Sequence, residues 1–113
     1  MHEMSIAQSL ISIIEDEMAK NNAARLMSVR LKIGEMSGVV PEALKTCFEI
    51  LTEKSDMEGA VLKMNIAPLM GYCRKCKQEF KVIEYDFSCP ECESTDIDII
   101  SGREMNIVEI EVD

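Results

Sequence analysis

The sequence predicts an α+β fold: two helices on a small three-stranded sheet, with an inserted four-cysteine zinc-ribbon module. Two segments have the apolar spacing of amphipathic helices, three segments alternate between apolar and polar residues, and four of the five cysteines form two C-x2-C pairs. The chain has 113 residues, of which 47% are hydrophobic, so it can bury one modest core. The last alternating segment follows the cysteines, which indicates that the module is an insertion.

The first helix and the first strand come before position 38. Apolar residues recur every fourth position from Ile6 to Met18, which predicts an amphipathic helix over residues 4–21. Apolar and polar residues then alternate over residues 27–33, the pattern of a half-buried strand. Residues 34–38 begin and end with glycine and are expected to form a turn.

The remaining elements of the sheet lie on both sides of the cysteines. Pro41 suits the first position of a second helix, and Glu42 suits the positive end of its dipole. Apolar residues continue this helix to about Lys54. Residues 60–68 are expected to form a second strand, and residues 108–112 a last one. The predicted domains are therefore residues 1–69 with 100–113, and a ribbon domain over residues 70–99.

The strongest motif is the set Cys73, Cys76, Cys89 and Cys92, which reads C-x2-C, twelve residues, C-x2-C. Each pair can wrap a tight turn that points two sulfur atoms at one ion, and the gap between the pairs fits a short hairpin. This spacing favours a tetrahedral zinc site over disulfides or an iron–sulfur cluster. Four thiolates leave no position for water, so the zinc would be structural. Cys47 is interpreted as a small buried apolar residue.

Two further features surround the cysteines. Arg74, Lys75 and Lys77 flank the first pair and are interpreted as offsetting the negative charge of the thiolates. Glu93 follows the last cysteine, where glycine would most easily accept a left-handed backbone conformation, so we expect local strain there.

The single histidine, His2, directly follows Met1. A histidine in second position normally leaves the initiator methionine in place. The α-amine, the His2 backbone nitrogen and the imidazole can then close two fused chelate rings around one divalent ion. Loss of the peptide proton gives a strong in-plane field, which suits Ni(II) or Cu(II). The alternative is that His2 is an ordinary terminal residue.

Composition excludes several classes of function. The formal net charge of −9 repels phosphate backbones, so nucleic-acid binding is not expected. No apolar run approaches the roughly 20 residues that span a bilayer, so no membrane association is expected. The start of the chain has no basic region typical of a signal peptide. We therefore expect a cytoplasmic protein with reduced cysteines.

These pieces together resemble the HypA/HybF family, the nickel-delivery metallochaperones of nickel–iron hydrogenase maturation. The resemblance rests on the opening Met1-His2-Glu3, the helix behind it, and the paired cysteines before a final strand. It extends to the strand end over residues 30–35 and the helix start over residues 40–44. The family's usual glycine after the last cysteine pair is Glu93 here.

The resemblance implies that His2 is the indispensable nickel ligand, assisted by backbone nitrogens near the N-terminus. It implies that Glu3 contributes to the nickel site by tuning nickel binding or partner docking, and that the four cysteines hold structural zinc. It further implies docking with a nickel-handling GTPase (HypB) and with the hydrogenase large-subunit precursor. The oligomeric state, monomer or homodimer, stays open.

Two other functions compete with a nickel carrier. The first is a zinc-ribbon module that contacts nucleic acid or another protein without handling nickel. The second is an enzyme, which is disfavoured because the chain has one histidine, no glycine-rich phosphate loop and no cysteine–histidine pair brought together by the pattern. We expect a carrier and not an enzyme.

Overall fold

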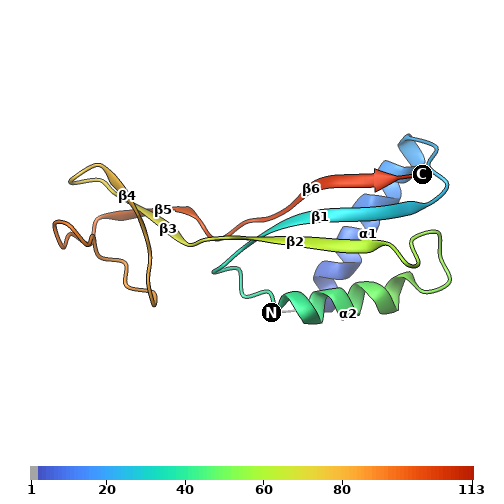
Figure 1. The fold of residues 1–113 in the computed structure, drawn as a ribbon, viewed down its shortest axis with the longest axis horizontal. Coiled ribbons are helices and arrows are strands. Elements are labelled where there is room, and N and C mark those ends of the chain that lie inside the picture. Colours follow the sequence, from blue (N-terminus) through green and yellow to red (C-terminus); the bar gives the residue numbers. More distant parts are fainter. Residues whose placement is uncertain (1–2) are drawn as a thin grey trace. The chain divides into compact units, whose positions relative to one another are not determined.

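A computed structural model describes residues 3–113, which form two helices and six strands (Figure 1). The elements are α1 (Glu3–Lys20), β1 (Leu26–Gly34), α2 (Pro41–Thr52), β2 (Val61–Ala67), β3 (Met70–Cys73), β4 (Gln78–Lys81), β5 (Ile97–Ser101) and β6 (Met105–Val112). The predicted α+β class is confirmed. In the described part of the chain, no helix is both long and apolar enough to cross a membrane.

The chain divides into two compact units. The first consists of residues up to Lys32 together with Gly38–Asn65 and Asn106–Asp113, and the second consists of Ile33–Ser37 and Ile66–Met105. The domain boundaries that the sequence indicated stay a prediction. The two units are described separately below.

The first unit is built on a three-stranded sheet in the order β2-β1-β6. Gly34 N–H donates to the carbonyl of Glu104, and Asp113 N–H donates to the carbonyl of Arg25. These two bonds join opposite ends of β1 and β6, so the two strands run antiparallel. The expected strands over 27–33, 60–68 and 108–112 are therefore confirmed, with β6 beginning three residues earlier than predicted.

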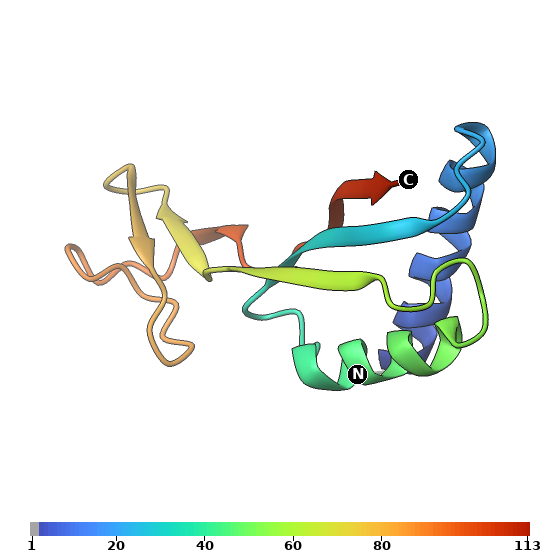
Figure 2. The same cartoon turned by 45° about the vertical axis from the view of Figure 1, so that its right-hand side comes forward.

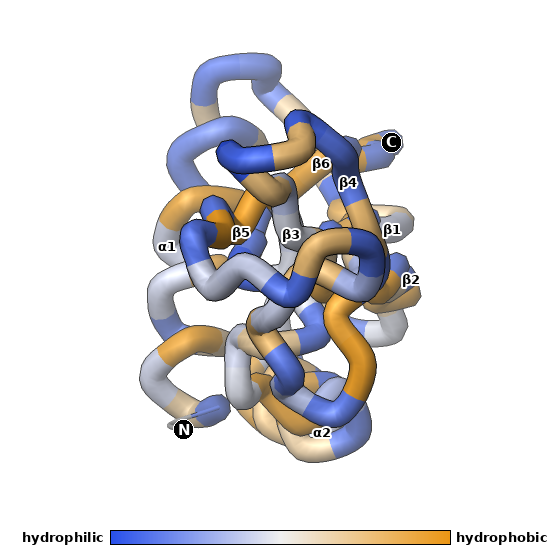
Figure 3. The backbone as a smooth tube through the Cα atoms, turned by 90° about the vertical axis from the view of Figure 1, so that its left-hand side faces the viewer, coloured by the Kyte–Doolittle hydropathy of each residue, from blue (hydrophilic) through white to orange (hydrophobic). Residues whose placement is uncertain are grey.

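The core lies between this sheet and the helices, which cover one of its faces (Figures 1 and 2). Val29 and Leu31 of the central strand are almost completely buried. Ile14 of α1 and Phe48 of α2 are buried too, and the two helices pack against each other. The alternation in β1 and the four-residue spacing in α1 therefore meet in one core, and Figure 3 shows hydrophobic and hydrophilic residues following one another along α1.

A row of polar side chains crosses the opposite face of the sheet. Arg30 of β1 donates to Asn65 Oδ1 of β2 at 3.1 Å. Its Nε lies 3.9 Å from the carboxylate of Glu109 on β6. This row crosses all three strands, which is consistent with a sheet that has one solvated face.

The helix boundaries follow local chemistry. α1 ends where Asn22 takes a positive φ of 50°, and Ala23 N–H donates to the carbonyl of Met18 at 2.9 Å. α2 begins with Pro41 at its first position, as predicted. The N-cap residue Val40 has no side chain able to cap the helix.

The second unit contains a three-stranded antiparallel sheet in the order β4-β3-β5. The expected hairpin between the two cysteine pairs is wrong. The hairpin is formed by β3 and β4, with Cys73 paired to Gln78, so it encloses the first cysteine pair. The reason is that the C-x2-C turn itself reverses the chain, and strands then pair on either side of it.

Candidate metal centre

The structure brings the four predicted cysteines together. The Sγ atoms of Cys73, Cys76, Cys89 and Cys92 all lie within 4.8 Å of one another. Cys73 Sγ lies 3.6 Å from Cys92 Sγ, and Cys76 Sγ lies 3.4 Å from Cys89 Sγ. A tetrahedral zinc–thiolate site with bonds of about 2.3 Å places its sulfurs about 3.8 Å apart. A disulfide would need about 2.05 Å. The arrangement therefore fits a tetrahedral metal ion and not disulfides.

The two pairs form matching turns, which we call the first knuckle (residues 73–77) and the second knuckle (residues 89–93). In the first, Lys77 N–H donates to the carbonyl of Cys73 at 2.7 Å. In the second, Glu93 N–H donates to the carbonyl of Cys89 at 2.8 Å. Lys77 has φ 59° and Glu93 has φ 64°, so both take the left-handed conformation. The strain expected at Glu93 is confirmed, whereas its counterpart at Lys77 was missed.

Backbone N–H groups favour ionisation of one thiol in each knuckle. Cys76 N–H donates to Cys73 Sγ at 3.5 Å, and this contact is the main cause that lowers the pKa of Cys73 to about 7. In the second knuckle the backbone of Cys92 contributes most to lowering the pKa of Cys89. The N–H of Glu91, 3.4 Å from Cys89 Sγ, acts in the same direction.

The other two thiols hold their protons more tightly. The contact with Cys89 is the main cause that raises the pKa of Cys76 to about 12. At Cys92 the backbone N–H of Ser94 lowers the pKa, but desolvation and the contact with Cys73 outweigh it and raise the pKa. In each knuckle one thiol therefore ionises more readily than the other, and a metal ion that binds all four sulfurs must displace protons.

Burial differs among the four ligand positions. Cys73 and Cys89 are buried, Cys76 is half-buried, and Cys92 is exposed. Cys73 ends β3, Cys76 lies in the following turn, and the second pair lies in the loop between β4 and β5. Four sulfurs complete a tetrahedron without a water ligand, so this site can hold a metal but offers no position for hydrolysis.

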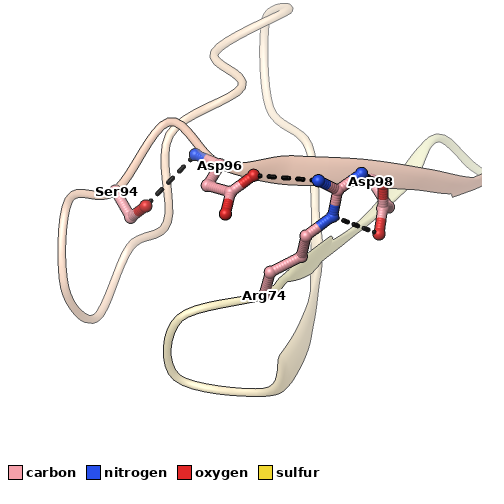
Figure 4. Close-up of polar contacts among 4 residues, drawn as sticks. All are labelled: Arg74, Ser94, Asp96 and Asp98. Atoms are coloured by element: carbon pink, nitrogen blue, oxygen red, sulfur yellow. Dashed lines mark hydrogen bonds and ion pairs between the residues drawn. The ribbon is translucent and has the colours of Figure 1, made fainter.

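The interpretation of Arg74 as a counter-charge for the thiolates requires correction. Its guanidinium contacts two carboxylates, those of Asp96 and Asp98 (Figure 4). Asp98 is the main cause that raises the pKa of Arg74, and Arg74 in turn lowers the pKa of Asp98. Asp96 and Asp98 follow Arg74 by 22 and 24 residues, so local spacing could not have indicated them.

The remaining predicted site residues lie at the start of α1 and in α2. His2 lies outside the described residues. Glu3 is the first residue of α1, and its Oε2 accepts a hydrogen bond from Val40 N–H at 3.1 Å. This contact joins the starts of the two helices. Cys47 is half-buried and so only partly fits its interpretation as a buried apolar residue.

A small α+β unit joined to a four-cysteine ribbon that can hold one metal ion defines a class of metal-binding proteins. A family model described as "Hydrogenase/urease nickel incorporation, metallochaperone, hypA" matches residues 1–112. The chain therefore belongs to the HypA family, and is a nickel metallochaperone of hydrogenase maturation and not an enzyme.

Individual relatives agree along the whole chain. The hydrogenase maturation factor HypA of Geotalea uraniireducens is 41% identical over 115 residues, with 100% of each chain covered. That of Solidesulfovibrio magneticus is 42% identical over 117 residues, again with complete coverage. The solution structure of the Ni metallochaperone HypA from Helicobacter pylori matches with a TM-score of 0.70 and 31% identity, covering 99% of this chain and 97% of that one.

Proposed function

We propose that the chain binds one Ni(II) at its N-terminus and delivers it for nickel–iron hydrogenase maturation. The proposed ligands are the α-amine, the backbone nitrogen of His2 and the His2 imidazole. The observation that carries this proposal is that His2 is the only histidine of a chain whose whole length matches a nickel-incorporation family. Imidazole is a favoured ligand for Ni(II), and the chain offers one.

We also propose that Cys73, Cys76, Cys89 and Cys92 hold a structural Zn(II). The separations of 3.4 and 3.6 Å between sulfurs support tetrahedral coordination. Closed four-thiolate sites of this kind are typical of zinc. Zinc would join the two knuckles, because the β3–β4 hairpin contains the first knuckle but not the second.

Glu3 is proposed as part of the nickel end in one of two ways. Its carboxylate either binds nickel directly or holds the start of α1 through the hydrogen bond from Val40 N–H. The contact with Val40 supports the second role, because it fixes the residue that follows His2. Glu3→Gln keeps an oxygen acceptor for Val40, whereas Glu3→Ala does not. If Glu3 anchors α1, Gln should bind nickel almost as wild type does and Ala should bind it more weakly.

Family membership supports the proposed partners, a nickel-handling GTPase (HypB) and the hydrogenase large-subunit precursor. Both would meet this protein in the cytoplasm, where the cysteines stay reduced. Nickel transfer to such a partner requires an exposed and reversible site, and a chelate at a chain terminus meets that requirement.

Nickel titration calorimetry on zinc-loaded protein with its native N-terminus tests the proposal. His2→Ala removes the imidazole, and one added N-terminal glycine displaces the amine while keeping His2. We expect one nickel per wild-type chain and loss of this binding in both variants. Equal binding by all three proteins would place nickel elsewhere and favour a zinc-ribbon interaction module.

A further inference from the structure

We propose that Arg74 is a positioning residue for the four-cysteine site, and that it acts through Asp96 and Asp98. In this role it holds the first knuckle against the segment that leaves the second knuckle, so that the sulfurs are close to their metal-binding geometry before the ion arrives. The inference rests on the proposed zinc site but concerns residues that do not bind the metal.

The guanidinium makes a bidentate contact with one carboxylate and a single hydrogen bond with another. Arg74 Nε donates to Asp98 Oδ2 at 2.8 Å, and its Nη2 contacts Asp98 Oδ1. Its Nη1 donates to Asp96 Oδ1 at 3.3 Å. A bidentate arginine–carboxylate pair fixes the relative orientation of its partners as well as their distance.

Hydrogen bonds that involve the backbone connect this contact to both knuckles, and Figure 4 shows the one between Asp96 N–H and Ser94 Oγ. Arg74 itself lies between the two cysteines of the first knuckle, and its N–H donates to the carbonyl of Asp96 at 3.1 Å. Asp96 N–H donates to Ser94 Oγ at 3.1 Å, and Cys89 N–H donates to the carbonyl of Ser94 at 2.9 Å. A continuous path therefore runs from Cys73 through Arg74, Asp96 and Ser94 to Cys89.

The two knuckles differ in what else holds them. The first is enclosed by the β3–β4 hairpin. The second lies in the long loop after β4, and strand pairing resumes only where Cys73 pairs with Ile97 and Tyr72 pairs with Asp98. The contacts of Arg74 extend this pairing beyond its last strand residue, toward the second knuckle.

The simpler interpretation is an ordinary surface ion pair. The side chains of Arg74, Asp96 and Asp98 are 57%, 59% and 42% exposed, and isolated pairs at such positions contribute little. Two observations separate this group from an isolated pair: the bidentate geometry, and the additional backbone bond between Arg74 and Asp96. Residues that orient metal ligands from outside typically change metal affinity by about 10–100-fold when mutated.

Zinc affinity, measured by competition with a chromophoric chelator on the full-length chain, tests this role. Arg74→Lys keeps the charge but cannot make the bidentate contact, and Asp98→Asn removes the paired charge. We expect each to weaken zinc binding by about 10-fold or more. Lys81→Ala is the matched control, because it removes one positive charge from an exposed β4 residue of the same unit that lies outside both knuckles. It should bind zinc as wild type does.

The exchanged pair Arg74→Asp with Asp98→Arg tests coupling between the two side chains. If the double variant binds zinc more tightly than Arg74→Asp alone and Asp98→Arg alone, this partial recovery supports the positioning role. Cobalt substitution provides a separate readout, because the absorption of a tetrahedral four-thiolate site reports the ligand set at saturation. If wild type lacks this spectrum, the zinc assignment fails; if wild type shows it and all variants bind zinc equally tightly, only the role of Arg74 is overturned.

Discussion

Gly34→Ala should destabilise the second unit more than the change to alanine at any other glycine of this chain. An ideal Cβ on Gly34 would lie 2.1 Å from both the carbonyl carbon and the oxygen of Gly102, and 2.5 Å from Arg103 N. Carbon atoms in favourable contact are about 3.5–4.0 Å apart, so the facing backbone must move by about 1.5 Å. Backbone atoms cannot avoid the clash by changing a rotamer.

The magnitude follows from what this movement breaks. Gly34 N–H donates to the carbonyl of Glu104 at 2.7 Å, and Met36 N–H donates to the carbonyl of Gly102 at 2.7 Å. Each lost hydrogen bond costs about 1 kcal/mol, and overpacking adds about 1–3 kcal/mol. The free energy of unfolding of zinc-loaded Gly34→Ala should therefore fall by roughly 3–5 kcal/mol.

Urea unfolding measures this loss, and amide hydrogen exchange at Gly34 and Met36 locates it. Gly59→Ala is the control, because its added Cβ would meet only Arg25 Nη2 at 3.8 Å, although its φ of 82° is unfavourable for alanine. That strain should cost about 1 kcal/mol. If Gly34→Ala loses no more stability than Gly59→Ala, the argument from backbone proximity is wrong.

Three further predictions concern the site and its surroundings. Glu93→Gly should raise the free energy of unfolding by about 1 kcal/mol in urea titrations, because it relieves a φ of 64°; a loss of stability would contradict this. Arg74 lowers the pKa of Asp98. In zinc-free protein, Asp98→Asn should therefore be less stable than wild type above about pH 4. This difference should vanish at lower pH, where the wild-type carboxylate becomes protonated. Urea unfolding of both proteins from pH 2 to 7 tests this sign, and a difference that grows on acidification would refute it. Nickel affinity of the native chain should fall as pH drops through about 6.5, the ordinary imidazole pKa, and calorimetry showing constant affinity below about pH 6 would oppose ligation by His2.

Local patterns predicted most of the first unit. The four-residue spacing up to Met18 defined α1, and the alternation in β1 defined its buried face. Pro41 marked the first residue of α2 correctly. These predictions succeeded because each depends on residues within a few positions of one another, and burial then selects one face of the element.

The second unit shows where such reasoning ends. The cysteine spacing predicted the ligand cluster, but not that the first knuckle would be the turn of a hairpin. The left-handed residue Lys77 was missed although it occupies the same place after its cysteine pair as Glu93 does. In the first unit, the contact between Glu3 and Val40 spans 37 positions, and no local period can report such a separation. Such contacts arise only when the elements pack.

The place of β6 in the sheet has a consequence for the order of assembly during synthesis. β6 follows the ribbon in the chain, yet it pairs with β1, which precedes the ribbon. Synthesis runs from the N-terminus, so both knuckles are made before β6. One edge of β1 therefore stays unpaired until the last strand of the chain has been made. The unit that begins with the proposed nickel end is translated first and completed last.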